Sequence, residues 1–247
     1  MAVAPSRLWV CNFDGTLYRG GLARLTGGIS NTDLFVQALL AAQDWGQCHR
    51  LLRGGWAIFG LHRRLRREMG AGRLSLADYD ATCIGALREL LRREFRPAVL
   101  WRLGEALAGG LNPHALAALQ RWLQPQDRLL ILSKAFLPVL IPASVRVSAS
   151  LNRPVAVVGN RFSEEGGILR AADKERELHR FLAGWRPDEA IAVGDTEEDV
   201  GMRDTLRGEG IPARLLAVAP KDARLASAAD AVLPNWRQAG TRPFADR

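Results

Sequence analysis

The sequence predicts an α/β protein whose core is a doubly wound, Rossmann-like parallel sheet with helices on both faces. An all-helical domain is inserted after the first strand. Short, nearly continuous apolar runs alternate with helical segments in the second half of the chain, which is typical of parallel strands buried on both faces. A long stretch after the first apolar run carries helical spacing alone, so its helices form an insertion.

The first half begins with one strand and continues as helices. Leu8–Cys11 is the strand, an apolar run that ends in a loop with a glycine. Helical spacing follows, with Ser30 or Asn31 as the candidate N-cap, and Ser75 begins a later helix with Asp78 in the capping-box position. The predicted helices are 31–41, 51–69, 75–96, 97–107 and 113–123.

The second half alternates strands with helices. Helices are predicted over Asp173–Ala183 and Met202–Arg207. The predicted strands are Arg128–Leu132, Val155–Val158, Ala190–Val193, Arg214–Val218 and Ala231–Leu233. These elements and the first strand make up a core domain over 1–20 and 118–247, and the helical insertion covers 21–117.

Composition and charge narrow the class of partner. Of 247 residues, 48% are hydrophobic and 24% are charged, as in a globular protein with a full-sized core. The net charge of +8 favours anionic partners, although the arginines are so widely spread that a coding bias explains them equally well. No nucleic-acid-binding motif and no alternation of aromatic with basic residues is present, so we expect no nucleic-acid partner.

The cysteines and the apolar stretches indicate the cellular compartment of the protein. Cys11, Cys48 and Cys83 fit no metal-binding spacing, and an odd number without a secretory signal favours a reducing, cytoplasmic compartment. The apolar stretch Leu51–Leu61 is far shorter than the roughly 20 residues that span a bilayer. The basic segment Leu61–Arg67 could lie on a membrane surface or cover a site, but we expect it to face water. The oligomeric state does not follow from the sequence.

Polar side chains follow the predicted strands at the points where these end. Asn12 and Asp14 come after the first strand, Ser133 after the second and Asp195 after the fourth. Because the carboxyl ends of parallel strands meet at one edge, where such sheets bind ligands, we expect these side chains to converge. The alternatives are local: turn residues at 12 and 14, and helix-capping roles for Asp195 and Asp199.

Four segments in this order resemble the motifs of the haloacid dehalogenase superfamily. They are Asn12–Leu17, Leu130–Ser133, Lys174 at the start of a helix, and Gly194-Asp195 followed by Asp199. The first and last are specific, and the other two gain weight from order and spacing. The helical insertion lies where this superfamily carries its cap domain. The segment 158–169 is similar to the phosphoserine-phosphatase-like branch, in which a strand, a short turn and a hairpin precede the lysine.

The resemblance implies a magnesium-dependent phosphatase with an aspartate nucleophile at position 12. The implied Mg²⁺ ligands are the side chain of residue 12, the backbone carbonyl of Asp14, and Asp195. Asp199 would be a further ligand or would hold the water shell. Asp14 would protonate the leaving oxygen and then activate water.

The resemblance also implies contacts to the phosphate and substrate. Ser133 and Lys174 would bind the phosphate oxygens. Lys134 is the alternative to Lys174 as the lysine that contacts the phosphate. Backbone amides next to Gly15 could point at the phosphate. Further predicted substrate-binding residues are Phe13, Gly15, Thr16 and Arg19, and Thr16 fits a structural role in the loop equally well.

Asn12 departs from the pattern, because an amide is a poor nucleophile and brings no charge to a metal. Either aspartate was deliberately replaced by asparagine to trap a substrate complex, or the protein naturally lacks catalysis. The other motif residues are intact, which favours the substitution.

The predicted function is therefore that of a magnesium-dependent phosphomonoesterase. It would act on a small phosphorylated metabolite through an aspartyl-phosphate intermediate, and the chain with Asn12 would be slow or inactive. The alternatives are a catalytically dead protein that binds a phosphorylated ligand or partner, and a phosphotransferase or lipid-phosphate phosphatase on the same scaffold.

Overall fold

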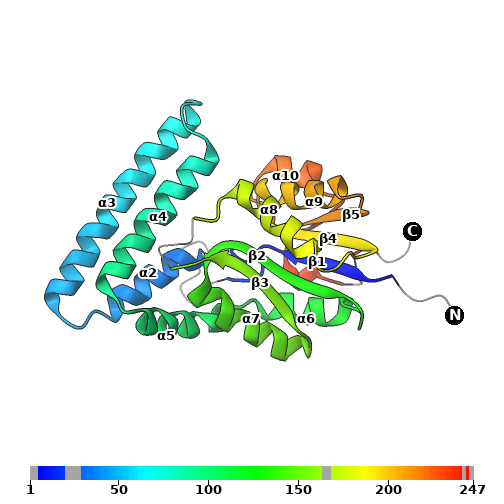
Figure 1. The fold of residues 1–247 in the computed structure, drawn as a ribbon, viewed down its shortest axis with the longest axis horizontal. Coiled ribbons are helices and arrows are strands. Elements are labelled where there is room, and N and C mark those ends of the chain that lie inside the picture. The colour runs from blue at the N-terminus through cyan, green and yellow to red at the C-terminus, as the bar shows by residue number, and fades with distance from the viewer. Residues whose placement is uncertain (1–4, 20–28, 163–167, 241–242, 245–247) are drawn as a thin grey trace.

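The computed structural model describes residues 5–19, 29–162, 168–240 and 243–244. The strands in these ranges form one parallel sheet in the order β3-β2-β1-β4-β5-β6 (Figure 1). The strands are β1 Arg7–Cys11, β2 Arg128–Phe136, β3 Val155–Asn160, β4 Glu189–Gly194, β5 Ala213–Val218 and β6 Ala231–Leu233. The chain runs outward from β1 to β3, then returns to β4 on the other side of β1. The doubly wound parallel fold is therefore confirmed, with its topological switch point between β1 and β4.

Helices cover both faces of this sheet. In Figure 1, α6 and α7 lie on one face and α8, α9 and α10 on the other. The helices are α2 Ser30–Leu40, α3 Trp45–Gly70, α4 Leu76–Glu94, α5 Pro97–Leu107, α6 Pro113–Trp122, α7 Leu137–Leu151, α8 Ala171–Leu182, α9 Glu198–Gly208 and α10 Ala223–Ala228. Short 3₁₀ turns occupy Ala108–Gly110 and Trp236–Gln238.

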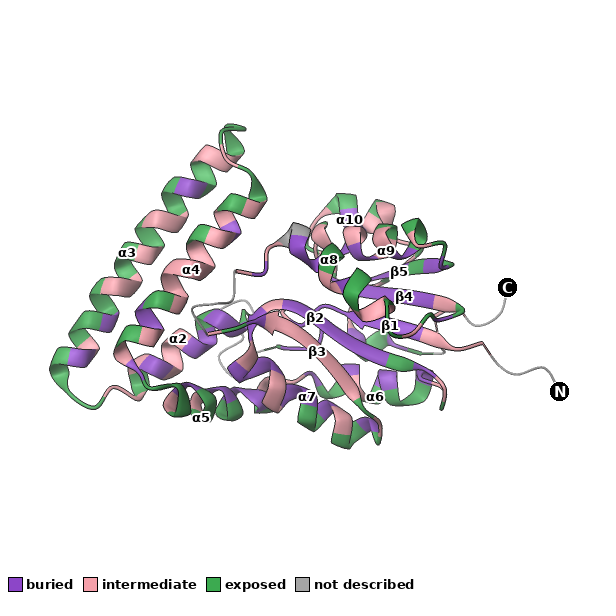
Figure 2. Ribbon diagram, in the orientation of Figure 1, coloured by how far each residue is buried: buried purple, intermediate pink, exposed green. Residues whose placement is uncertain are grey.

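The central strands are mostly apolar because both of their faces are buried. In β1, Trp9 and Cys11 belong to the core that includes Trp122 of α6, whereas Leu8 and Val10 belong to the core on the side of α9. These four residues of β1 are fully buried (Figure 2). Alternation along a strand sends successive side chains to opposite faces, and each fully buried large apolar side chain contributes about 1.5–3 kcal/mol.

Helices α3 and α4 form a helical hairpin that projects from the sheet domain (Figure 1). Most of its residues are exposed or half-buried (Figure 2). The α3 helix begins at Trp45, earlier than predicted, because the Asp44 carboxylate accepts a hydrogen bond from the Gln47 N–H at 2.7 Å. In α4, Ser75 Oγ accepts from the Asp78 N–H at 3.1 Å, which confirms the predicted cap.

The prediction of a side-chain N-cap at Ser30 or Asn31 is wrong. Helix α2 starts at Ser30 after Ile29, and no side chain caps it. The Asn31 side chain instead contacts the end of β2, where its Oδ1 accepts from the Phe136 N–H at 3.1 Å and its Nδ2 donates to the Lys134 carbonyl at 3.4 Å. Asn31 therefore ties α2 to the sheet.

Two helices of the sheet domain, α7 and α10, were not predicted from the sequence. The predicted domain boundary at 117/118 falls inside α6, and the division into 1–20 with 118–247 and 21–117 stays a prediction. The predicted hairpin before the lysine falls largely on residues 163–167, outside the described residues. None of the helices in the described ranges combines the length and the apolar character that crossing a bilayer requires.

Candidate active site

Asn12 and Asp195 meet at the switch point between β1 and β4. The Asn12 N–H donates to the Val193 carbonyl at 2.9 Å, which continues the pairing of β1 with β4. The Asn12 side-chain Nδ2 donates to Asp195 Oδ1 at 3.2 Å and to the Asp14 carbonyl at 3.4 Å. Asn12 Oδ1 accepts from the Phe13 N–H at 2.9 Å. The two residues that the sequence placed after different strands therefore share one hydrogen-bond network.

The loop after β1 brings its backbone against Asp195. Gly15 has φ +75°, and a Cβ at this position would lie 2.0 Å from Asp195 Oδ2. Only glycine fits such an approach without displacing the carboxylate. The buried Thr16 donates through Oγ1 to Asp195 Oδ1 at 3.2 Å, and its carbonyl accepts from Trp236 Nε1 at 2.8 Å. Thr16 therefore orients Asp195 and ties the loop to the C-terminal segment.

Lys221 is a site residue that sequence reasoning missed. Its Nζ lies 2.6 Å from Asp195 Oδ2, and its N–H donates to the Asp195 carbonyl at 2.9 Å. Lys221 follows the end of β5, so its position next to a strand end was the signal that could have identified it. The half-exposed ammonium group neutralises the buried Asp195 carboxylate, whose pKa burial raises.

Asp199 organises the loop after β4. Its Oδ2 accepts from the Asp195 and Thr196 N–H groups at 2.9 and 3.0 Å, and its Oδ1 accepts from Lys174 Nζ at 3.4 Å. Both Asp199 and Lys174 are almost fully buried. Asp199 thus fixes the backbone that carries Asp195 and positions the Lys174 ammonium group. Its predicted role as a metal ligand stays a prediction.

The Asp14 carboxyl group has properties of an acid that exchanges protons near neutral pH. Burial raises the pKa of Asp14 to about 6, and the nearby Asp195 carboxylate also raises it. The hydrogen bonds from Ser30, at the start of α2, act in the opposite direction, and its N–H lies 2.9 Å from Asp14 Oδ1. A carboxyl with such a pKa is available in both protonation states near neutral pH.

The prediction that Ser133 follows the second strand is wrong, because β2 continues to Phe136 and contains both Ser133 and Lys134. The two side chains differ in their surroundings. Ser133 is buried, and its Oγ accepts from the Ala135 N–H at 3.2 Å, which leaves its own hydroxyl hydrogen to donate elsewhere. The Lys134 Nζ lies 2.8 Å from Asp80 of α4 and 2.8 Å from Glu198 of α9. Lys134 therefore links the helical hairpin to the sheet domain.

Two of the predicted substrate contacts lie away from this network. The Phe13 side chain is fully buried in the core and stacks on Tyr18, with ring centroids 5.1 Å apart. Only its backbone N–H, bonded to Asn12, is part of the site. Arg19 is exposed, and its N–H donates to the Gly110 carbonyl at 2.9 Å. Their roles as substrate contacts stay predictions.

A cavity of about 640 Å³ lies between these strand ends and the helical hairpin. Such a volume is typical of sites for small organic ligands. The residues that line it from the sheet domain are Asn12, Asp14, Ser133, Lys134, Lys174, Thr196, Glu198 and Lys221. The cavity thus brings together residues from all four sequence segments, with Thr196 and Glu198 belonging to the last.

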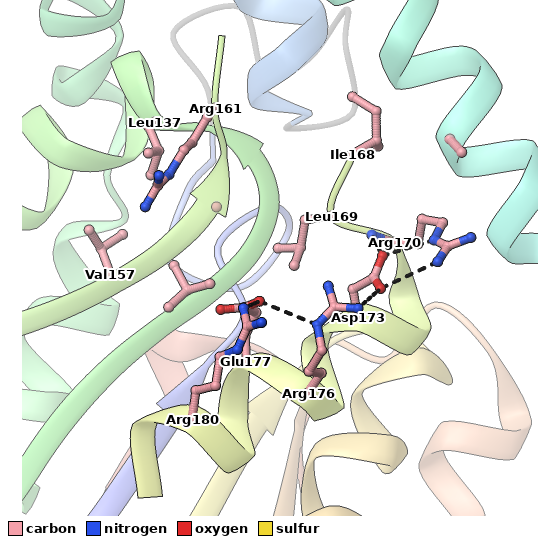
Figure 3. A pocket seen from close by; sticks show the side chains of 13 residues that line it. Leu137, Val157, Arg161, Ile168, Leu169, Arg170, Asp173, Arg176, Glu177 and Arg180 are labelled. Carbon is pink, nitrogen blue, oxygen red and sulfur yellow. Dashed lines mark hydrogen bonds and ion pairs between the residues drawn. The ribbon is translucent and has the colours of Figure 1, made fainter. Parts of the chain in front are cut away.

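A second cavity of about 640 Å³ lies beside β3 and α8 and is rich in arginine (Figure 3). Its charges are largely paired with one another: Asp173 lies 2.9 Å from Arg170 and 3.0 Å from Arg176, and Glu177 lies 2.6 Å from Arg180. The cavity borders the edge strand β3, away from the switch point. We therefore place the candidate site at the first cavity.

The oxygen atoms at the switch point are of the chemical type that binds a magnesium ion. Asp195 Oδ1 and the Asp14 carbonyl both accept from Asn12 Nδ2, so they converge on one point. Both are hard oxygen ligands, which Mg²⁺ prefers, and a side-chain oxygen at position 12 would complete the set. No group of three His, Cys, Asp or Glu side chains in the described part of the chain forms a metal site by itself. Asn12 gives the site one carboxylate fewer than aspartate would.

Comparison with solved structures finds the same fold at low sequence identity. A protein of unknown function from Bordetella pertussis Tohama I has a TM-score of 0.60 and 15% identity, covering 93% of this chain and 99% of that one. Cytosolic 5'-nucleotidase IIIB, bound to cytidine, has a TM-score of 0.56 and 17% identity, covering 86% and 72%. A gene product of Archaeoglobus fulgidus has a TM-score of 0.54 and 14% identity, covering 93% and 79%.

A search of curated proteins by sequence found no match. The family model of the haloacid dehalogenase-like hydrolases matches residues 9–203. This range includes the whole network around Asn12 and Asp195 except Lys221 and Trp236, and it includes all four segments on which the resemblance rests. The chain therefore belongs to the haloacid dehalogenase-like hydrolases.

Proposed function

We propose that this chain is a phosphomonoesterase of its family in which Asn12 blocks the first chemical step. One observation carries the proposal: Asn12, Asp14, Ser133 and Lys174 line one cavity, although they come from three distant parts of the sequence. The Asp195 carboxylate is hydrogen-bonded to the Asn12 side chain. The arrangement offers acid–base, hydroxyl and ammonium groups to one bound phosphate monoester.

With aspartate at position 12, each group would have a defined task. The carboxylate would attack phosphorus and form an aspartyl phosphate, while the ester oxygen leaves with the proton of Asp14. Asp14 would then take a proton from water as the water attacks phosphorus, which releases inorganic phosphate and the free carboxylate. The Asp14 pKa of about 6 suits both steps. Asn12 cannot begin this sequence, because its amide nitrogen carries no available lone pair.

Ser133 and Lys174 would hold the phosphate oxygens. The hydroxyl of Ser133 would donate one hydrogen bond, and the buried Lys174 ammonium group would supply positive charge where charge develops. Asp195, the Asp14 carbonyl and residue 12 would hold Mg²⁺, which when bound would reduce the repulsion between the phosphate and an attacking anion. Asp199 would keep Lys174 and the Asp195 backbone in place through the contacts that it makes now.

The helical hairpin would act as the cap of this site. It lines the same cavity through residues of α3 and α4, and Lys134 joins it to the sheet domain through Asp80. Opening of the hairpin would admit the substrate, and closure would exclude water.

Two other functions use the same geometry. A catalytically inactive protein that binds a phosphorylated ligand is favoured by the hydrogen bonds that Asn12 makes to Asp195 and the Asp14 carbonyl, since they hold the site together without a carboxylate at position 12. A phosphotransferase would pass the phosphoryl group to an alcohol in place of water. Product analysis in the presence of glycerol separates transfer from hydrolysis.

The test compares phosphate release by this chain and its Asn12→Asp variant across a panel of phosphate esters with MgCl₂. We expect the variant to hydrolyse at least one ester more than 100-fold faster, about 3 kcal/mol of barrier, and to lose this gain in EDTA. The double variant Asn12→Asp/Asp14→Asn controls for contaminating phosphatase and should be inactive. Inactivity of Asn12→Asp on the whole panel, together with phosphate-ester binding by the unaltered chain, would leave the binding protein as the function.

A further inference from the structure

The cavity at the strand ends has two chemically different walls. The sheet-domain wall carries the charged and polar groups described above, three lysines among them. The opposite wall, from α2 and the helical hairpin, is mostly apolar. Its apolar residues are Ile29, Phe35, Ile58, Phe59, Ile84 and Leu87. A phosphate monoester bound at the strand ends would therefore extend its organic group across an apolar surface.

The apolar wall is a packed surface built from three helices. Phe35 of α2 lies against the backbone of α3 at Gly55, where an added Cβ would be 2.4 Å from the Phe35 Cζ. Gly55 thus lets the aromatic ring and α3 approach closely. Ile58 lies one turn further along α3, and Ile84 and Leu87 face the cavity from α4. These side chains offer a continuous apolar contact area to a ligand.

The polar groups of the hairpin that line the cavity are already engaged. The Tyr79 hydroxyl and His62 Nδ1 are hydrogen-bonded to each other, 2.5 Å apart. Burial raises the pKa of the Tyr79 phenol, so it stays neutral at physiological pH. The Asp80 carboxylate accepts from Lys134 Nζ at 2.8 Å. The Tyr79 hydroxyl, His62 Nδ1 and one Asp80 oxygen are therefore already hydrogen-bonded within the protein, and a sugar hydroxyl would have to compete with these contacts.

We infer that the substrate class is a phosphate monoester of an apolar alcohol, such as an alkyl or isoprenoid phosphate. The inference rests on the proposed function, because it assumes that phosphate binds at the strand ends. Burial of the organic group on the hairpin wall would then supply the affinity and the selectivity. Polar phosphate esters would bind more weakly, because they would lose hydration at this wall and gain few hydrogen bonds there.

The test measures dissociation constants of the unaltered chain by titration calorimetry. The ligands are inorganic phosphate, butyl, hexyl and octyl phosphate below their micelle concentrations, and glucose 6-phosphate. Each buried methylene should raise the affinity about threefold to fourfold, so octyl phosphate should bind roughly 100-fold more tightly than butyl phosphate. Equal affinities along the series, or tighter binding of glucose 6-phosphate than of octyl phosphate, would overturn the inference.

A charged side chain on the apolar wall provides the matched variant. Ile58→Asp should weaken octyl phosphate binding more than tenfold, and inorganic phosphate binding by much less, because only the repulsion between the two anions acts on the latter. Val145→Asp puts the same charge on an exposed apolar position of α7, outside the cavity, and should change neither. If Ile58→Asp does not fold, Ile84→Ala takes its place and should weaken only the longer esters. Equal effects of the wall variant and Val145→Asp would contradict the inference.

The results separate this inference from the proposed function. If the Asn12→Asp variant hydrolyses esters without regard to the length of the alkyl chain, the phosphatase proposal stands and the substrate class is wrong. If no phosphate compound binds and Asn12→Asp is inactive, the proposed function itself fails. Binding that increases with chain length while Asn12→Asp stays inactive supports the ligand class in a binding protein. Hydrolysis that increases with chain length supports both.

Discussion

At the scale of single residues, Gly15 and Gly72 share a backbone conformation but differ in their surroundings. Their φ angles are +75° and +70°, and a Cβ at 15 would meet Asp195 whereas a Cβ at 72 would meet nothing within 4 Å. Gly72→Ala should therefore cost only the strain of a positive φ, about 1–2 kcal/mol. Gly15→Ala should cost at least about 1 kcal/mol more, because Asp195 must move.

Urea unfolding of both variants measures this difference in the free energy of unfolding. Gly15→Ala should also break the ion pair between Asp195 and Lys221, because the Asp195 carboxylate is displaced. Equal destabilisation by the two substitutions would mean that the loop relaxes without disturbing Asp195, and that the close approach of Gly15 is not needed.

Position 12 decides how charge is balanced at the switch point. Asn12→Asp would replace a donor 3.2 Å from Asp195 Oδ1 with a second carboxylate, and two carboxylates at such a distance repel each other. In EDTA we expect the melting temperature of Asn12→Asp to lie several degrees below that of the unaltered chain. This corresponds to a loss of about 1–2 kcal/mol in the free energy of unfolding. Added MgCl₂ should raise it again, and by more than in the unaltered chain, because the cation binds the folded state.

Thermal unfolding with and without MgCl₂ tests this without any enzymatic assay. The double variant Asn12→Asp/Asp195→Asn is the control, since it keeps one carboxylate and should show a smaller loss in EDTA. A Mg²⁺ effect that is the same with asparagine and aspartate at position 12 would argue against a cation site at this point.

Among single residues, the positions of most strand ends could be predicted from the sequence, whereas the hydrogen-bond and ion-pair partners could not. Asn12, Asp14 and Asp195 follow strands, whose ends are visible in the sequence as the close of an apolar run, whereas Ser133 lies inside β2, which continues to Phe136. The bond from Asn31 to Phe136 and the ion pair of Lys221 are different in kind, because they depend on how distant segments pack. No local spacing encodes such a contact.

At the scale of elements, Lys134 connects the end of β2 to both α4 and α9. Its ammonium group lies between Asp80 and Glu198, and the Asp80 side chain is almost fully buried. Lys134→Met would leave two carboxylates facing each other without a cation. We expect a loss of about 2 kcal/mol, less than for a fully buried pair, measured by denaturant unfolding.

Asp80→Asn tests the same bridge from the other side and has a different pH dependence. Burial raises the pKa of Asp80, and Glu198 also raises it, whereas Lys134 and Lys174 lower it. A raised pKa means that the stabilising contribution of Asp80 is present below its unfolded pKa and is lost as the pH rises through its folded pKa. The stability of Asp80→Asn relative to the unaltered chain should therefore increase from pH 4 to pH 7.

Unfolding free energies of Asp80→Asn at a series of pH values provide the check. At pH 7 the variant should lose less stability than Lys134→Met, because the Asn amide oxygen still accepts from Lys134. A relative stability that falls with rising pH would show that the ion pair with Lys134 outweighs the cost of burying Asp80.

Helix α7 shows why element prediction from this sequence was incomplete. Pro142 lies inside the helix, and a proline there usually argues against one. It lacks the N–H that would donate to the Pro138 carbonyl, and Gly104 of α5 packs so close to that carbonyl that a Cβ would lie 1.8 Å away. The contact between α5 and α7 and the burial of one face stabilise a helix that its own sequence disfavours.

At the scale of the whole molecule, the fold class was predictable and the strand order was not. Apolar runs alternating with helices indicate a parallel sheet, since only strands buried on both faces are apolar throughout. The order β3-β2-β1-β4-β5-β6 depends on which side of β1 each crossover returns to. The lengths of the connections do not determine this side. The convergence of Asn12 with Asp195, however, requires β1 and β4 to be neighbours.

Added salt should weaken the part of ligand binding that depends on the net charge of +8. It should not weaken the part that depends on the apolar wall of the cavity. Screening shortens the reach of charge from about 8 Å at 0.15 M to about 3 Å at 1 M salt, so inorganic phosphate should bind roughly tenfold more weakly at 1 M NaCl. Apolar burial is not screened, so the ratio of octyl to butyl phosphate affinity should stay constant or rise. Calorimetric titrations at both salt concentrations measure the two effects together.

If the affinity for inorganic phosphate does not respond to salt, the basic surface contributes nothing to the site, and a coding bias toward arginine accounts for the net charge. If the octyl-to-butyl ratio falls along with the phosphate affinity, the alkyl chain does not reach the apolar wall, and the hairpin covers the site without selecting the ligand.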